Sequence, residues 1–374
     1  MSALDERHQL VERWASLLDG DARRRHPLYA QLCDAAPSHR ALVDPLEHAP
    51  AAQRRPNLLL AAVHHLCLRL EAVELAPWYP TLRWMLQLDG DLDAPDGDPP
   101  PPGPLPDGGL EAVLSFLKAH SAEVASLLAT RSTQTNEPGR SAALLYGLRQ
   151  LTGEGRAVAL IDLGASAGLN LHPERYQFAL SDGTILGDPS SSVCVDVEIR
   201  GAARPGFDPP IAWRRGLDLR PLDARNDEDA RWLLACQWPD DPVRFERTRR
   251  ALRLARAETE PVIVEQGDVV DDLDALVALA PAELHLVVFH SWMAAYLTEE
   301  RQRALRDRLE AVAATRPLSW LWFEHPSEVP GLAPPAVPGK RLRGSSILVL
   351  EEPGRGPAVL AQAHPHGTWL APVS

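Results

Sequence analysis

The chain has 374 residues, 45% of them hydrophobic and 24% charged, which is ordinary for a globular protein of one large or two medium domains. Its formal net charge of −13 argues against a nucleic-acid partner, because phosphate binding requires a clustered basic surface. The stretch Arg244–Arg256 is rich in arginine, but other residue types interrupt the arginines, so we interpret it as the solvated face of a helix.

The four cysteines are scattered, with no C-x-x-C pair and no histidine at metal-ligand spacing. We therefore expect neither a disulfide framework nor a metal site, and a reducing cytoplasm is the natural compartment. The first 18 residues contain Asp5, Glu6 and Glu12 and lack the basic start and apolar run of a signal peptide. No stretch approaches the ~20 apolar residues of a membrane span, so no membrane partner is expected.

Residues 1–152 predict a helical region. Apolar residues recur at helical spacing over 10–18 and 110–128, and residues 57–75 start as a helix that is apolar nearly all round, on which His64 and His65 are expected to be structural. The segment 91–109 holds seven Pro, four Gly and five Asp, which predicts a flexible loop or linker.

Residues 153–374 predict a Rossmann-like α/β domain, because short apolar runs alternate with helical segments. We expect a mostly parallel sheet with its first strand in the centre, crossover helices at 276–280 and 298–314, and an antiparallel hairpin of 346–351 and 358–363 at one edge. The predicted parallel strands cover residues 157–163, 211–217, 261–265, 284–289 and 318–323.

Residues 172–210 predict a β-rich insertion between the first two parallel strands. Asp182-Gly183 is a strong hairpin turn, and apolar and polar residues alternate strictly over 193–199. The insertion either covers a ligand cleft or extends the interface of the domain.

The nine residues Asp162–Asn170 follow the first strand and carry the main functional signal. Small residues there let a backbone approach a ligand, and a turn into a helix presents free N–H groups. Asp162 lies where doubly wound sheets bind ligands. The alternative is a tight turn chosen for packing.

Two later acids follow the next two strands. Asp218 ends the second strand, where a carboxylate can accept both hydroxyls of a ribose, and Gly267-Asp268 ends the third, where it can hold an adenine amino group. The alternatives are a surface acid in a turn for Asp218 and a helix N-cap for Asp268.

Together these features resemble the class I S-adenosylmethionine-dependent methyltransferases over residues 157–363. The resemblance implies that Asp162 and the turn line the methionine and ribose part of the cofactor, that Asp218 binds the ribose, and that Gly267 and Asp268 meet the adenine. The turn residues so implied are Gly164, Ala165, Ser166, Gly168 and Asn170. Two departures are that the turn has only two glycines and that Asp218 comes 54 positions after Gly164, where ~20 is usual for a short crossover, so an insertion is required.

The segment Thr133–Arg140 is a second dense polar cluster. We expect it to lie against the Gly164–Asn170 turn, because the helix that follows it leads directly into the first strand. Glu137 is a candidate base. The alternative for the segment is helix capping, with Thr135 or Asn136 as the cap and Pro138 in the first turn. The candidate substrate contacts are Thr133, Gln134, Thr135, Asn136 and Arg140.

His290 ends the fourth strand, where it is a candidate general base with Trp292 and Tyr296 as substrate contacts. The alternative is a histidine hydrogen-bonded in place. Glu324-His325 after the fifth strand is a similar but weaker signal, and His364-Pro-His366 fits a surface segment.

The whole chain resembles a bacterial family catalogued as domain of unknown function 2332, through Thr133–Arg140, the Gly-Ala-Ser-Ala-Gly-Leu-Asn turn and the late His-Pro-His-Gly-x-Trp. That resemblance supplies no reaction. The expected function is methyl transfer from S-adenosylmethionine to a small molecule. The alternatives are a non-catalytic ligand-binding or scaffold protein, and a dinucleotide-dependent oxidoreductase, which the missing G-x-G-x-x-G disfavours.

Overall fold

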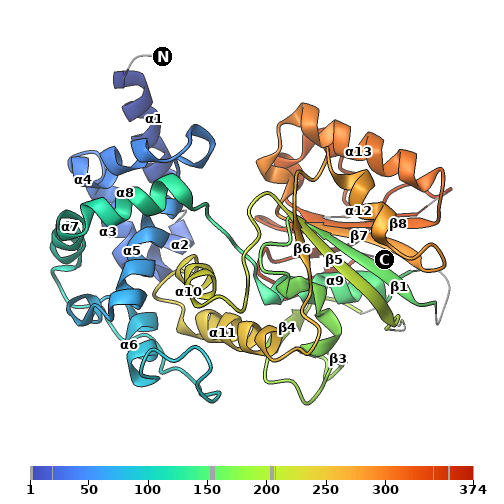
Figure 1. The fold of residues 1–374 in the computed structure, drawn as a ribbon, viewed down its shortest axis with the longest axis horizontal. Coiled ribbons are helices and arrows are strands. Elements are labelled where there is room, and N and C mark those ends of the chain that lie inside the picture. The colour runs from blue at the N-terminus through green and yellow to red at the C-terminus, as the bar shows by residue number, and fades with distance from the viewer. Residues whose placement is uncertain are drawn as a thin grey trace. The chain divides into compact units, whose positions relative to one another are not determined.

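The computed structural model describes residues 3–373 apart from 19, 152–155, 203–205, 207, 340 and 353. The chain divides into two compact units (Figure 1). The first combines the residues up to Thr135 with Ala224–Arg249, and the second combines Asn136–Asp223 with the residues from Arg250 onward. This division differs from the expected boundary at 152, because a later segment returns to the first unit and the boundary near the start lies earlier.

The first unit is helical, as its apolar periodicity predicts. His64 on α5 is fully buried, and its Nδ1 lies 3.1 Å from the carbonyl oxygens of Ala235 and Gln237, so it is structural as expected. The region 110–128 is two helices joined at an 82° bend, not the single helix that its periodicity suggested. The α-helices of this unit are α1 (Ala3–Ala15), α2 (Gly20–Arg25), α3 (Pro27–Ala35), α4 (Arg40–Val43), α5 (Pro56–Leu70), α6 (Pro80–Gln87), α7 (Gly109–Ala119), α8 (Ser121–Thr130), α10 (Asp227–Ala235) and the beginning of α11 (Pro242–Arg256).

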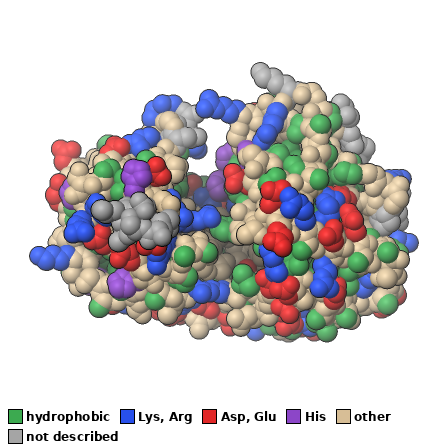
Figure 2. All heavy atoms as spheres, turned by 90° about the horizontal axis from the view of Figure 1, so that it is seen from above, with side chains coloured by type: hydrophobic (Ala, Val, Ile, Leu, Met, Phe, Trp, Pro, Cys, Tyr) green, Lys and Arg blue, Asp and Glu red, His purple; other side chains and the backbone are tan. Residues whose placement is uncertain are grey.

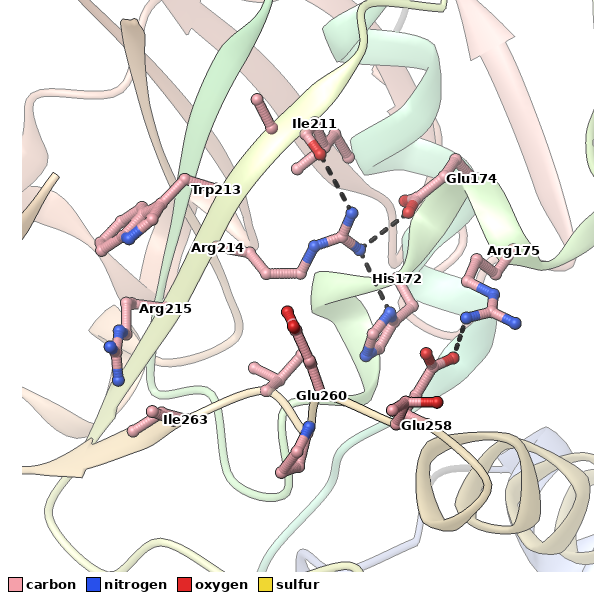
Figure 3. Close-up of a pocket in the computed structure, with 14 residues that line it drawn as sticks. His172, Glu174, Arg175, Ile211, Trp213, Arg214, Arg215, Glu258, Glu260 and Ile263 are labelled. Atoms are coloured by element: carbon pink, nitrogen blue, oxygen red, sulfur yellow. Dashed lines mark hydrogen bonds and ion pairs between the residues drawn. The ribbon is translucent and has the colours of Figure 1, made fainter. Parts of the chain in front are cut away.

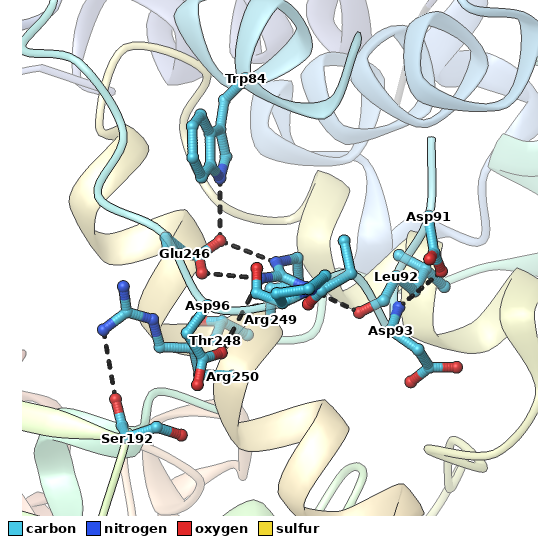
Figure 4. Close-up of polar contacts among 12 residues, drawn as sticks. Trp84, Asp91, Leu92, Asp93, Asp96, Ser192, Glu246, Thr248, Arg249 and Arg250 are labelled. Atoms are coloured by element: carbon cyan, nitrogen blue, oxygen red, sulfur yellow. Dashed lines mark hydrogen bonds and ion pairs between the residues drawn. The ribbon is translucent and has the colours of Figure 1, made fainter. Parts of the chain in front are cut away.

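A buried ion pair on α11 corrects two expectations (Figure 4). Arg249 is fully buried and forms a two-pronged pair with Glu246, with Nε–Oε2 at 2.7 Å and Nη2–Oε1 at 2.8 Å, so the arginine-rich helix is not simply a solvated face. Arg249 Nη1 also donates to the carbonyl oxygens of Leu92 and Ala94 at 2.9 and 2.8 Å. The proline-rich segment is therefore a loop anchored within its own unit, not a linker between units.

The second unit contains one large mixed sheet, mostly parallel, in the order β3-β2-β4-β11-β10-β9-β8-β7-β1-β5-β6. Its parallel strands β6-β5-β1-β7-β8 reverse their chain order at β1, which has β5 on one side and β7 on the other. The strands are β1 (Val158–Leu163), β2 (Gln177–Leu180), β3 (Ile185–Gly187), β4 (Cys194–Ile199), β5 (Ile211–Asp218), β6 (Val264–Gln266), β7 (His285–Ser291), β8 (Leu318–Glu324), β9 (Ser346–Glu351), β10 (Ala358–Ala363) and β11 (Trp369–Pro372).

Helices cover both faces of the parallel part of the sheet. On one face, α12 (Leu273–Leu279) and α13 (Glu299–Ala313) share a core with the inward side chains of β1, β7 and β8. Thr298 caps α13 as expected, by accepting from Arg301 N at 3.3 Å. On the other, α9 (Ser141–Leu148) packs on β8 and β9, and a Cβ added to Gly147 would lie 2.7 Å from Leu321 Cδ2. Glycine at 147 therefore permits this close approach.

The position of the β-rich insertion corrects the expectation that the C-terminal hairpin lies at an edge of the sheet. β9 and β10 are antiparallel as predicted, but they are not at an edge, because β11 pairs with β10 and then in parallel with β4. The strand β11 was missed because Trp369–Pro372 is short and ends in proline. The insertion therefore extends this sheet, and its β4 has the predicted alternation of exposed and buried residues.

Acidic and basic side chains are interspersed on the face of the second unit that carries α13 (Figure 2). Surface pairs such as Arg308–Asp274 mix the two signs of charge there, so this face is not a single-sign patch. No single helix in the described part of the chain has the length and apolar character needed to cross a membrane.

The buried ion pair gives a stability prediction. Arg249→Met should lower the free energy of unfolding by about 3–5 kcal/mol, because it removes the buried cation bound to the Glu246 carboxylate and the donor to the Leu92 and Ala94 carbonyl oxygens. Urea unfolding followed by circular dichroism measures this loss. Arg83→Met, an exposed arginine of α6, is the matched control and should change little. A loss no larger than that of the control would contradict the prediction. The double variant Glu246→Leu with Arg249→Met should recover much of the lost stability, because it removes both buried charges.

Candidate functional site at the carboxyl end of the parallel strands

The turn after β1 has an uncommon backbone. Gly164, Ser166 and Gly168 have φ values of 77°, 56° and 74°, and Ser166 adopts this left-handed conformation without being a glycine. A Cβ at Gly164 would lie 2.4 Å from Met293 Cγ, so glycine is required there. The expected α-helix after the turn is only a short 3₁₀ helix, Leu169–Leu171, and Leu169 N already donates to Asn136 Oδ1 at 2.9 Å. The turn therefore presents fewer free N–H groups than expected.

The segment from Asn136 to Ser141 lies against this turn, as predicted. Besides the Asn136–Leu169 bond, Ser141 Oγ donates to Asn170 Oδ1 at 2.8 Å. Glu137 is fully buried and caps the following turn by accepting from Gly139 N at 3.0 Å, so the capping residue is Glu137 and not Thr135 or Asn136. The rest of the predicted cluster, Thr133–Thr135, belongs to the first unit, where Gln134 N lies 3.4 Å from Cys236 Sγ.

His290 and Glu324 form a buried pair at the ends of β7 and β8. Both side chains have no exposed surface, and His290 Nδ1 lies 2.8 Å from Glu324 Oε1. The same oxygen accepts from the backbone N–H groups of Met293 at 3.0 Å and Ala294 at 3.1 Å. Because an ionised carboxylate only accepts, the Nδ1 atom carries a proton, and in the neutral imidazole Nε2 is then the acceptor.

Trp292, two residues after His290, has a strained backbone conformation. Its φ is 54°, a rare value for a bulky residue, and its indole Nε1 donates to Ser346 Oγ at 2.9 Å. The Arg140 guanidinium lies 5.9 Å from the Trp292 ring centre, and Arg140 also donates to the carbonyl oxygens of Ser291 and Pro365. Such strain costs of order 1–3 kcal/mol and is found preferentially at functional sites. Tyr296, in contrast, is more than half exposed.

Several buried polar atoms at this end of the sheet have no hydrogen-bond partner among the described residues. Buried polar atoms are normally paired, so each exception asks for an explanation such as a catalytic role or a bound group. They are Asp162 Oδ2, Ser166 Oγ, His290 Nε2 and Glu324 Oε2.

The electrostatics of Asp162 differ from those of an exposed acid. The side chain is 2% exposed, and burial, followed by the neighbouring charge of Asp218, raises its pKa well above the usual range, while Arg140 acts in the opposite direction. Asp162 therefore tends to hold a proton that an exposed aspartate would lose.

The two later acids organise their own loops. Asp218 accepts from Ser166 N at 2.9 Å and from Arg220 N at 2.8 Å, so it ties the β1 turn to the end of β5. Asp268 accepts from the N–H groups of Val270 and Asp271 within a turn and also pairs with Arg301, while the N-cap position of α12 is Asp272 and not Asp268. Gly267 N donates to the Asp218 carbonyl oxygen at 2.9 Å. The ribose and adenine roles of these acids remain predictions.

Sequence reasoning gave Glu324 only a minor place and missed its pairing with His290. The available signal was that both residues end neighbouring strands of a parallel sheet. In the described part of the chain, no group of three or more His, Cys, Asp or Glu side chains is arranged to hold a metal ion.

Comparison with known proteins gives one match. A family model described as "Uncharacterized protein conserved in bacteria (DUF2332)" matches residues 12–371. No curated protein and no solved structure matches the chain.

The raised pKa of Asp162 predicts that this side chain lowers the stability of the fold as pH rises. The folded state favours the protonated form of Asp162. The contribution of this side chain to the free energy of unfolding is therefore fully present below the unfolded pKa of about 3.9, and it is lost as pH rises through the higher folded pKa. Asp162→Asn should therefore stabilise the protein at pH 7, and should do so much less at pH 4, where the aspartate of the wild type holds its proton.

Thermal unfolding at the two pH values measures this difference. The exposed Asp182 gives a control of opposite sign, because bonds from the Thr184 main chain and side chain lower its pKa. Its contribution is present above the unfolded pKa and is lost as pH falls, so Asp182→Asn should cost more at pH 7 than at pH 3. An Asp162→Asn variant that is less stable than wild type at pH 7 would show that the ionised carboxylate is stabilised.

Proposed function

The chain belongs to the bacterial family DUF2332, and from the geometry of its site we propose that it transfers a methyl group from S-adenosylmethionine to a small molecule. The observation that carries the proposal is the gathering of unpartnered buried polar atoms where the parallel strands end. In open α/β sheets, ligands bind outside the carboxyl ends of the strands at the point where the strand order reverses, and here that point is β1. These atoms are suited to meet a ligand that replaces their missing partners.

The residues around β1 fit a nucleoside-type methyl donor. Asp162 has a buried unpartnered oxygen that can accept from an ammonium group, and the positive-φ glycines let a ligand approach the turn closely. Asp218 is half-buried, and each of its oxygens takes one main-chain bond, which leaves lone pairs for ribose hydroxyls. When bound, S-adenosylmethionine supplies a methyl group on a cationic sulfonium.

His290 is the residue we propose to take a proton from a hydroxyl acceptor. Glu324 holds the imidazole in one tautomer and one orientation through Nδ1, so that Nε2 is the accepting atom. The same carboxylate fixes the Met293–Ala294 backbone, and Arg140 borders Trp292 on the same side. Glu324 is thus a positioning residue, and the main contribution of the protein is alignment of the reacting groups.

Calorimetric titration tests cofactor binding. We expect saturable binding of S-adenosylmethionine and S-adenosylhomocysteine and none of the nicotinamide dinucleotides, which the oxidoreductase alternative requires. Asp218→Ala should weaken S-adenosylmethionine binding at least tenfold, or ~1.4 kcal/mol, because it removes the ribose acceptor and the anchor of the turn. The milder Asp218→Asn keeps one acceptor oxygen and should lose less. Unchanged affinity in a folded Asp218→Ala variant would refute the ribose role.

Release of S-adenosylhomocysteine over a panel of hydroxyl, amine and carboxylate acceptors tests transfer. His290→Gln should slow turnover of a hydroxyl acceptor by about 10²–10⁴-fold and leave cofactor affinity nearly unchanged. His285→Gln, at the opposite end of the same strand, is the control and should keep the rate. Equal rates for the two variants would exclude His290 as the base. Cofactor binding without turnover on any acceptor would favour a non-catalytic ligand-binding protein.

A further inference from the structure

A cavity of about 680 Å³ lies at the opposite end of β5 from the proposed methyl-transfer site (Figure 3). One wall is the first half of β5, Ile211–Arg215, and another is the segment Glu258–Ile263 that leads into β6. His172 and Glu174 close a third side. None of these residues is among those proposed to hold the methyl donor, so the two sites share no lining residue.

The sheet is open along this cavity. β5 and β6 pair only from Gly216–Val264 to Asp218–Gln266, and Gly216 N donates to Ile263 O at 3.0 Å. Because backbone groups alternate in direction along a strand, the N–H and C=O of Arg214 point to the same side as those of Gly216. Neither group has a partner among the residues that the structure describes. A main-chain donor and acceptor therefore face the cavity.

Three arginines and three glutamates line the cavity, and Glu260 is the one among them without a pairing to a described residue, because Arg215 pairs with Glu265 outside the lining at 3.2 Å. Glu258 pairs with Arg175, and Glu174 lies 2.7 Å from Arg214 Nη1, but Glu260 is exposed and has no hydrogen bond or ion pair to any described residue. Figure 3 shows its carboxylate pointing into the cavity. A ligand cation would therefore find a counter-charge without breaking an existing pair.

His172 adds a neutral donor to this wall. The side chain is 5% exposed, and its Nδ1 lies 3.1 Å from Arg214 Nη1, which can only donate. The proton is therefore on Nε2. Burial and then the charges of Arg214 and Arg175 lower the pKa of His172 to about 3, so the ring adds no positive charge that would repel a cation at neutral pH.

We propose that this cavity binds a short extended peptide that carries a basic side chain. Its main chain would pair with the open N–H and C=O of Arg214, as a strand added between β5 and the Glu258–Val262 segment that precedes the β5–β6 pairing, and its cation would meet Glu260. Ile263, whose side chain is 46% exposed, and its neighbour Val262 offer apolar contacts to the other peptide side chains. The volume is in the range of natural ligand sites.

A positional-scanning library of acetylated pentapeptide amides, measured by fluorescence anisotropy on the full chain, provides the probe. We expect the peptides that bind to be enriched in lysine or arginine. The best binder should lose at least tenfold in affinity when the residue facing Arg214 is N-methylated, because N-methylation removes a main-chain donor and keeps every side chain. Its acidic analogue, with Glu in place of the basic residue, should not bind.

Variants of the protein test the charge separately. Glu260→Gln should weaken the basic peptide at least fivefold, and Glu111→Gln, an exposed acid of the first unit, should not. S-adenosylmethionine affinity should be equal in both variants, which separates this proposal from the function proposed above. The proposal is overturned if no library member binds below 1 mM, or if the binders tolerate both N-methylation and loss of the Glu260 charge.

Discussion

One carboxylate oxygen, Glu324 Oε1, connects the parts of the second unit on which the proposed chemistry depends. It accepts from the His290 ring and from two consecutive backbone N–H groups after β7, so it joins the end of β8 to the end of β7 and to the turn that follows. Hydrogen bonds to a charged acceptor in a buried setting are stronger than neutral ones. The same atom therefore orients the imidazole and holds the backbone directly after Trp292.

The turn after β1 depends on a comparable anchor. Asp218 holds Ser166 in its left-handed conformation, and the side chain of Met293 occupies the space where a Cβ on Gly164 would be. The segments at the ends of β1, β5 and β7 are thereby packed closely against one another. Such close packing leaves few atoms free to move, which favours a pre-organised site over one that forms only on binding.

Much of this arrangement could be predicted from the sequence, because it depends on local patterns. Apolar runs indicated β1, β7 and β8, and strict alternation indicated β4 with one solvent-facing side. The placement of Asn136 against the β1 turn was predicted from chain connectivity, because the helix after Asn136 leads directly into β1. Periodicity failed where the chain bends without a proline or glycine, as between α7 and α8.

The sequence by itself determined which residue types stand at the carboxyl ends of the parallel strands, since strand ends and turns are set by short-range chemistry. Only the tertiary structure decided that His290 pairs with Glu324, that the insertion joins the sheet through β11, and that Ala224–Arg249 returns to the first unit. Each of these depends on contacts between residues far apart in the chain. A hydrogen-bonding group or a strand edge can pair with many different partners, and the packing of the whole core selects one of them.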